Sequence, residues 1–252
     1  MDLASLALVA LAGVCAGAVN TLAGGGTLLV YPALLAAGLP PVSANITSLI
    51  GLTPGYIGGA WAYREEIGRE RRRLPVLAPV ALAGAVVGAL ILLVTPGDTF
   101  EAVIPFLVLF SALLLFIQPW LKKKFTPADA GRQSPRTGFV GPAGVFVASA
   151  YGSYFSAGVG VLMLAFLGAT IHADFQRING LKNVLSLVIV LAGVAVYAFS
   201  GHADWWSVLV LLPSSGVGGW VGGRLARRLN GDVLRYAVTV LGVVLAVVLF
   251  FV

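Results

Sequence analysis

Residues 17–51 read GAVNTLAGGGTLLVYPALLAAGLPPVSANITSLIG, and they have a counterpart in residues 151–185, YGSYFSAGVGVLMLAFLGATIHADFQRINGLKNVL. A gapless shift of 134 positions aligns the two stretches and places Gly24 on Gly158. The same shift pairs identical residues along the rest of the chain: Asn45 with Asn179, Gly59 with Gly193, Tyr63 with Tyr197, Pro79 with Pro213, Gly84 with Gly218 and Asp98 with Asp232. A period of this length indicates a duplicated domain rather than a solenoid.

Composition indicates a membrane protein along the whole length of the chain. Hydrophobic residues make up 59% of the sequence and charged residues only 10%, and the mean hydropathy is +0.97. A soluble domain carries about 25% charged residues. The predicted fold is an all-α polytopic membrane protein with two repeats of about five apolar segments each. These segments are predicted at 3–22, 27–37, 42–63, 74–94 and 99–121, and again at 138–156, 160–171, 175–199, 205–224 and 232–252.

The predicted organisation is a first transmembrane repeat at 1–121, a basic cytoplasmic linker at 122–137 and a second transmembrane repeat at 138–252. The first three residues carry no positive charge. Because a secretory signal peptide begins with a basic region, we expect residues 3–22 to be a retained segment.

Positive charge is confined to the connections between apolar segments. Fourteen of the sixteen basic residues lie in 64–73, 122–136 and 224–235. Cytoplasmic loops carry an excess of Lys and Arg, so this bias explains the net charge of +6 without nucleic acid and places all three stretches in the cytoplasm. The counterpart of 64–73 in the second repeat, 198–207, contains no Lys or Arg. We therefore predict inverted repeats, related by a pseudo-two-fold axis in the membrane plane, with both termini outside.

The second segment of each repeat is too short to span a bilayer upright. Residues 27–37 and 160–171 would form about 17 Å of helix, against a hydrocarbon core of about 30 Å. Each is predicted to be a half-helix, a re-entrant segment or a short crossing beside a water-filled cavity. Short, glycine-interrupted segments at corresponding positions of two repeats are typical of a transport site.

Glycine-rich turns precede both short segments, GGGT at 24–27 and GVG at 158–160. Glycine allows backbone N–H groups to approach a ligand, and a helix N-terminus attracts anions. A tight turn or close helix packing would explain the same glycines, and the two functions are compatible. Neither turn has the spacing of a phosphate loop or a dinucleotide-binding loop.

The third segments bring polar side chains into an apolar context. Asn45 and Asn179 are counterparts in the two repeats, and so are Ser48 and Lys182. A lysine about one and a half turns into an apolar helix is costly where it faces lipid, so we expect Lys182 to face a substrate. The alternative is a lysine that snorkels to the membrane interface.

Acidic residues are absent from the middle of every predicted segment; all ten lie at termini, loops or helix ends. This distribution favours an anionic or neutral substrate over a cation. His172, in the turn after the second short segment, is a candidate for proton coupling. No Ser/His/Asp set, carboxylate pair or metal-ligand cluster is recognisable, so we expect no enzyme activity, no cofactor and no metal.

The stretch 17–51 and the stretch INGLKNVLSLV at 178–188 resemble the TauE/SafE sulfite exporter family, over nearly the whole chain and with both repeats in family order. One departure is AGVG at 157–160, where the family often has a fuller glycine run. The resemblance implies transport of sulfite, sulfonates or other sulfur-containing or organic anions across a bacterial inner membrane. The implied substrate-binding residues are Gly24, Gly25, Gly26, Thr27, Asn45, Thr47, Ser48, Gly158, Gly160, Asn179, Lys182 and Asn183.

The sequence and the resemblance together predict an exporter of sulfite or a small organosulfonate that works by alternating access between its two repeats. Its expected partners are the small anion and the lipid bilayer, without nucleic acid, and a homo-oligomer is compatible with the pattern. Three alternatives stay open at this point: a carrier for another organic anion, a membrane-embedded enzyme and a structural membrane protein.

Overall fold

The structure is a computed structural model that describes residues 3–22, 25–124, 140–171, 173–225 and 231–251. These residues form helices and contain no strand, which confirms the all-α prediction. The first half contains α1 (Leu3–Leu22), α2 (Thr27–Ala36), α3 (Pro41–Gly51), α4 (Thr53–Ala62), α5 (Arg64–Arg69), α6 (Leu74–Val94) and α7 (Gly97–Lys124). The second contains α8 (Val140–Tyr154), α9 (Val159–Thr170), α10 (Phe175–Tyr197), α11 (Trp205–Leu225) and α12 (Gly231–Phe251).

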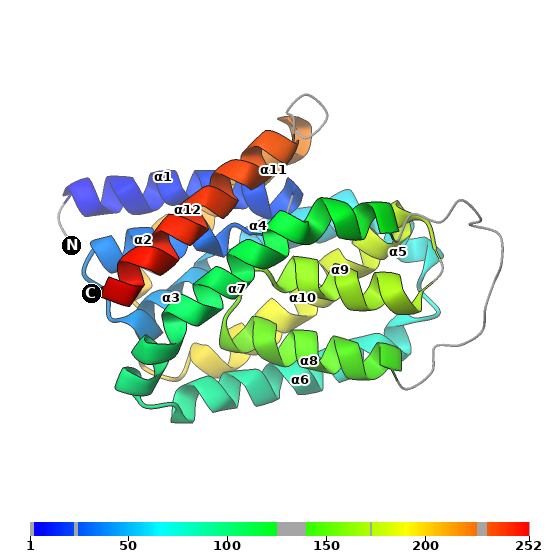
Figure 1. The fold of residues 1–252 in the computed structure, drawn as a ribbon, viewed down its shortest axis with the longest axis horizontal. Helices are drawn as coiled ribbons and strands as arrows, with labels where there is room; N and C mark the ends of the chain where they lie inside the picture. The colour runs from blue at the N-terminus through cyan, green and yellow to red at the C-terminus, as the bar shows by residue number, and fades with distance from the viewer. Residues whose placement is uncertain (1–2, 23–24, 125–139, 172, 226–230, 252) are drawn as a thin grey trace.

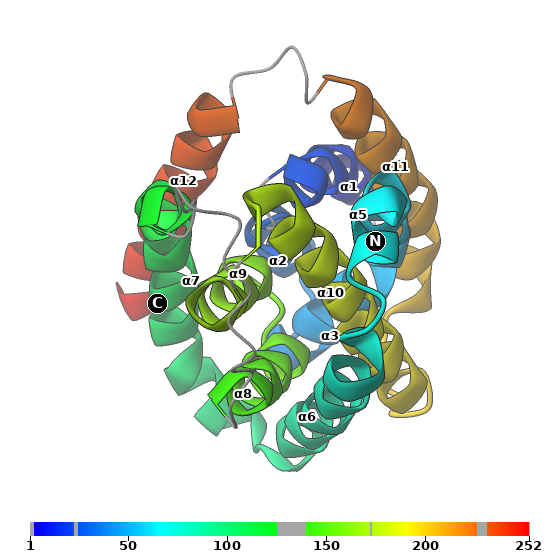
Figure 2. The same cartoon turned by 90° about the vertical axis from the view of Figure 1, so that its right-hand side faces the viewer.

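The short helices lie in the middle of the bundle. Figure 2 shows α2, α9 and α10 at the centre, surrounded by α6, α7, α8, α11 and α12. By length and composition, α6, α10 and residues 97–121 of α7 are the described helices able to cross a membrane. Helices α2 and α9 have only 10 and 12 residues, which corresponds to about 15–18 Å. The structure therefore places both short segments where they can contribute to a central site.

Helices of the two sequence halves are interleaved in space. Helix α1 packs along α11, and α6 packs along α8. Under the shift that aligns the repeats, α1 corresponds to α8 and α11 corresponds to α6. The pair α1–α11 is therefore equivalent to the pair α8–α6. Helices α7 and α12, which also correspond, pack on each other. Each half therefore depends on the other for much of its buried surface.

The third segment of the first repeat is broken, which differs from the continuous segment predicted at 42–63. Helix α3 ends at Gly51 and α4 begins at Thr53, whereas the equivalent α10 is continuous. Pro54 stands in the first turn of α4, and its counterpart is Val188. Proline has no N–H to donate to the preceding turn, and its ring clashes with the carbonyl four residues earlier, so it ends α3.

Close contacts between backbones hold the two equivalent helix pairs. A Cβ added to Gly17 of α1 would overlap the carbonyl oxygen of Ser215 on α11, and a Cβ added to Gly88 of α6 would overlap that of Ala150 on α8. Small residues at helix contacts allow this approach within a bilayer, where apolar burial gives no driving force between helices. Both pairs therefore depend on positions that tolerate no side chain.

We predict that Gly88→Ala destabilises the protein and that Gly58→Ala does not. Alanine normally stabilises a helix relative to glycine by about 1 kcal/mol, and nothing lies within 4 Å of the position of a Cβ on Gly58. At Gly88 the new methyl group meets backbone, and overpacking of this kind costs about 1–3 kcal/mol. Thermal unfolding in detergent should show a lower midpoint for Gly88→Ala alone; equal midpoints would contradict the packing described.

Helix ends that flank two of the basic connections lie at one end of the molecule. In Figure 1, α5, the end of α7 and the start of α8 lie toward the right, the end of α11 lies at the top near the middle, and both chain termini lie at the left. Exposed apolar side chains such as Leu90, Phe116 and Val248 cover the sides of the bundle between these ends, as expected of a surface that faces lipid.

We predict that the two ends label from opposite sides of the membrane. Single cysteines are introduced as Glu66→Cys, Ala130→Cys, Gly97→Cys and His202→Cys after replacement of Cys15, the single native cysteine. Inverted repeats with cytoplasmic basic loops require the first two to react from the cytoplasm and the last two from outside. Labelling of positions 66 and 202 from the same side would exclude the inverted arrangement.

Candidate functional site

The chain between α8 and α9 crosses the centre of the molecule and is bonded to helices of the first repeat. The hydroxyl of Thr27, at the start of α2, lies 2.9 Å from the hydroxyl of Ser156. The side-chain amide of Asn45, on α3, donates to the carbonyl of Tyr154 at 2.8 Å. Two predicted site residues of the first repeat thus meet the interruption between two helices of the second.

Side chains of α7 and α8 also bond to the chain between α8 and α9. The hydroxyls of Ser111 and Tyr151 both donate to the carbonyl of Ala157, at 3.0 and 2.9 Å. Gly158 follows with φ +76°, and a Cβ there would lie 3.2 Å from the Cα of Ser111. Glycine is required here by backbone conformation and close packing, as the tight-turn alternative proposed. Gly160 is buried in the first turn of α9.

The start of α2 is closed by a residue that the sequence analysis missed. The N–H of Gly26 donates to the side-chain oxygen of Asn20 at 2.8 Å, so this amide is already bonded and is not free for an anion. A Cβ on Gly26 would overlap the carbonyl oxygen of Ala16. Gly25 is buried beside it, and Gly24 lies outside the described residues. One signal was available: Asn20 is a polar side chain in an apolar segment, shortly before the glycine run.

The predicted residues of the second repeat share one face of α10. Asn179, Lys182 and Asn183 are 8%, 4% and 5% exposed, and their spacing places them on the same side of a helix. A Cβ on Gly59 of α4 would lie 3.3 Å from the side-chain oxygen of Asn183. The hydroxyl of Tyr63, at the end of α4, interacts with Asn179. This polar face therefore packs against the first repeat.

Lys182 lacks an ion-pair partner among the described residues. Both ion pairs among the described residues use Glu70, which lies 3.3 Å from Arg73 and 3.7 Å from Arg177. Lys182 takes part in neither, although it is almost fully buried. Removal of an ammonium group from water without a partner costs several kcal/mol. Its burial argues against the snorkelling alternative, and a bound anion would offset the cost.

Two predicted side chains form hydrogen bonds with the protein backbone. The hydroxyl of Thr47 accepts a hydrogen bond from the N–H of Asp204 at 3.0 Å, at the entry to α11. The hydroxyl of Ser48 donates to the carbonyl of Asn45 at 2.8 Å. His172 lies outside the described residues. Among the residues that the structure covers, no three His, Cys, Asp or Glu side chains gather to hold a metal ion.

Several buried polar atoms in this region have no hydrogen-bond partner. They belong to Asn20, Asn45, Tyr56, Ser153, Asn183 and Ser186. The Tyr56 hydroxyl faces Asn20 and Thr27 without forming a well-shaped hydrogen bond to either. A buried polar group left unpaired costs about 1–3 kcal/mol, so such atoms require water or a ligand. Ser186 lies one turn beyond Lys182 and continues the polar face of α10.

We predict that Asn20→Ala destabilises the fold and that Asn20→Asp does so less. Alanine leaves the buried N–H of Gly26 unpaired, at a cost of about 1–3 kcal/mol. A buried carboxyl group without a counter-charge takes up a proton, and its carbonyl oxygen can still accept that hydrogen bond. The measurement is the midpoint of thermal unfolding for the wild type and both variants. An unchanged midpoint for Asn20→Ala would show that this hydrogen bond does not hold the start of α2.

Comparison with known proteins gives matches over nearly the whole chain. The profile of the family described as "Sulfite exporter TauE/SafE" matches residues 9–249. A Sinorhizobium protein named "Probable membrane transporter protein ORF9" is 29% identical over 255 residues, covering 96% of this chain and 91% of its own length.

Two further relatives carry similar names. "Probable membrane transporter protein YfcA" of Escherichia coli strain K12 is 25% identical, covering 94% of this chain and 86% of its own. A "Probable membrane transporter protein" of Haemophilus influenzae is 22% identical, covering 94% and 91%. No solved structure matches the chain significantly.

Proposed function

The chain belongs to the TauE/SafE sulfite exporter family, and from this premise we propose that it carries sulfite or a small organosulfonate across the bacterial inner membrane. Its family and relatives identify a membrane transporter rather than an enzyme. Its apolar helices agree with a multi-pass membrane protein. Export is the direction we propose, following the description of the family.

The observation that carries the substrate proposal is the burial of Lys182 without an ion-pair partner among the described residues. Ionisable residues within membrane segments mark substrate pathways, and they need a partner. Both ion pairs of the described residues join Glu70 to an arginine, Arg73 or Arg177, and leave Lys182 out. An anionic substrate would supply the missing charge, and its departure would leave Lys182 unpaired again, which favours exchange of one anion for another.

The surroundings of Lys182 support an oxyanion. Asn183 and Ser186 carry buried N–H and O–H groups without partners, and Asn179 lies one turn earlier on the same face. Amide and hydroxyl donors of this kind match the several acceptor oxygens of sulfite or a sulfonate. We propose that Asn179, Lys182, Asn183 and Ser186 bind the anion.

We propose that the halves alternate between two arrangements around this site. The equivalent helix pairs α1–α11 and α6–α8 support the idea, because a pseudo-symmetric molecule can swap the conformations of its repeats. At the basic end, Gly180 of α10 packs against Glu66 of α5. Opening toward that end would require α5 to move away from the start of α10.

Proton coupling does not require a carboxylate in the site. The second proton of sulfite titrates near neutral pH, so protonation of the substrate itself can link flux to a proton gradient. His172 stays a candidate for a coupling role. Flux of sulfite that is independent of an imposed pH gradient would remove both possibilities.

We predict that purified protein in proteoliposomes exchanges radiolabelled sulfite and that Lys182→Gln lowers the exchange at least tenfold. Loss of one partner of a buried charge contact costs about 2 kcal/mol or more, and a tenfold change corresponds to about 1.4 kcal/mol. Arg69→Gln removes one positive charge from the exposed surface of α5 and is the matched control.

Unlabelled sulfonates, thiosulfate, sulfate and carboxylates serve as competitors in the same assay. Inhibition by sulfonates alone would assign the substrate class. If the protein exchanges a carboxylate and not sulfite, its substrate is another organic anion instead of a sulfur anion. Normal sulfite exchange by Lys182→Gln would remove Lys182 from the site.

A further inference from the structure

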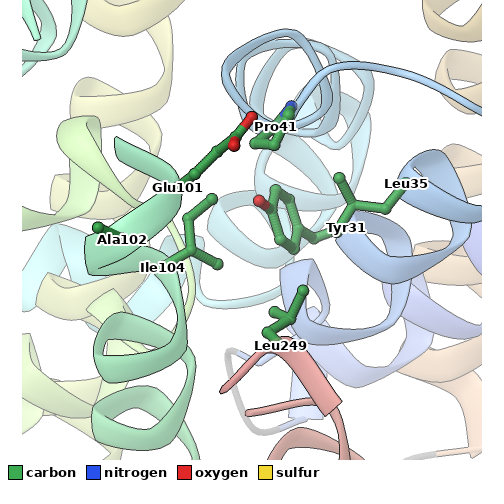
Figure 3. A pocket seen from close by; sticks show the side chains of 7 residues that line it. All are labelled: Tyr31, Leu35, Pro41, Glu101, Ala102, Ile104 and Leu249. Atoms are coloured by element: carbon green, nitrogen blue, oxygen red, sulfur yellow. The ribbon is translucent and has the colours of Figure 1, made fainter. Parts of the chain in front are cut away.

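A cavity of about 530 Å³ lies between the end of α2, the start of α3, the first turns of α7 and the end of α12. Figure 3 shows its lining side chains: Tyr31, Leu35, Pro41, Glu101, Ala102, Ile104 and Leu249. None of them comes from α10, so this cavity is separate from the polar face that carries Lys182. Its volume falls within the range of small-molecule sites, about 300–1,000 Å³.

Two polar groups converge on the cavity, and both can accept hydrogen bonds. The hydroxyl of Tyr31 has no hydrogen-bond partner, and the residue is only 1% exposed. In Figure 3 this hydroxyl points toward the wall formed by Glu101 and Ile104. Glu101 belongs to neither ion pair of the described residues. No basic residue is among the lining side chains.

We propose that this cavity binds a primary ammonium group attached to a small apolar body. A carboxylate without a basic neighbour attracts a cation and repels an anion. An ammonium group has three N–H donors, and the carboxylate of Glu101 and the oxygen of Tyr31 can accept two of them. Leu35, Ile104 and Leu249 provide an apolar wall for the rest of the ligand.

The site is placed to influence the centre of the molecule. Tyr31 lies one turn after Thr27 on α2, and its ring packs edge-on against Phe155 at 5.7 Å between centroids. Phe155 directly precedes Ser156, whose hydroxyl lies 2.9 Å from that of Thr27. A ligand that engages Tyr31 therefore acts on the segment that connects α8 and α9. The proposal stands without the sulfite assignment, since it uses no residue of the Lys182 site.

Two sources could supply this chemistry: the ethanolamine headgroup of a phospholipid, whose acyl chains would remain in the bilayer, and a free primary amine. The test uses benzylammonium as the probe, with benzyl alcohol and benzoate as neutral and anionic analogues of the same shape. Binding is measured by calorimetry on the purified full-length protein in detergent.

We expect benzylammonium to bind with clear preference over both analogues. Glu101→Gln should weaken its affinity at least tenfold, since a charge-assisted hydrogen bond contributes about 1.5–3 kcal/mol. Tyr31→Phe, which keeps the ring against Phe155, should weaken it about threefold to tenfold, as expected for a neutral hydrogen bond. Glu65→Gln, at an exposed acid on α5, should leave it unchanged.

Lipid composition then distinguishes the two sources. In nanodiscs that contain phosphatidylethanolamine, benzylammonium should bind more weakly than in phosphatidylcholine nanodiscs, whose headgroup has the same net charge but no N–H donor, if the lipid headgroup occupies the site. Equal affinity in both identifies a free amine as the ligand.

Three results would overturn the proposal: no binding of benzylammonium to the wild type, equal binding to Glu101→Gln, or binding of benzoate as strong as that of benzylammonium. Folding of each variant is checked by its elution and thermal midpoint. Glu101 lies at an exposed position, so its substitution by Gln should leave the fold intact.

Discussion

Backbone groups within a bilayer must find partners inside the protein, because hydrocarbon offers none. This constraint governs the places where helices of this chain are interrupted. The carbonyls of Tyr154 and Ala157 are satisfied by side chains from α3, α7 and α8, and the N–H of Gly26 is satisfied by Asn20. Two of these bonds, from Asn45 to Tyr154 and from Ser111 to Ala157, join one repeat to the other. The interruptions that create a central polar region are therefore also what ties the two halves together.

The two repeats share a fold but have diverged in chemistry at equivalent positions. Lys182 occupies the place of Ser48, and Asn183 occupies the place of Leu49. A Cβ added to Gly193 would lie 3.1 Å from the Leu49 side chain, and a Cβ added to Gly59 would lie 3.3 Å from that of Asn183. The geometry is thus conserved between the repeats while the polarity is concentrated on α10. Under the proposed function, a single charge in one half suffices for a single anion, since a second buried lysine would need its own counter-charge.

Periodicity and composition predicted the all-α fold and the short second helices, because both follow from the length of apolar runs. The break at Leu52 was missed, although Pro54 is visible in the sequence. The limits of the predicted segment 42–63 were set by hydropathy alone, which does not detect a proline within an apolar run. Side-chain bonding was harder to predict. The resemblance implied a substrate-binding role for Thr47, and in the structure its hydroxyl accepts a hydrogen bond from the backbone N–H of Asp204. Asn20 and Ser156 acquire their roles only through contacts with residues distant in sequence.

Charge is separated along the molecule in a way that bears on selectivity. The buried ammonium of Lys182 lies on α10, whereas the cavity near α2 and α7 presents the carboxylate of Glu101. A small anion that entered through this cavity would meet repulsion from Glu101 unless a cation accompanied it. A bound ammonium group would neutralise that carboxylate and remove the barrier. If both proposals hold, occupancy of this cavity and passage of an anion would be linked by electrostatics as well as by the contact of Tyr31 with Phe155.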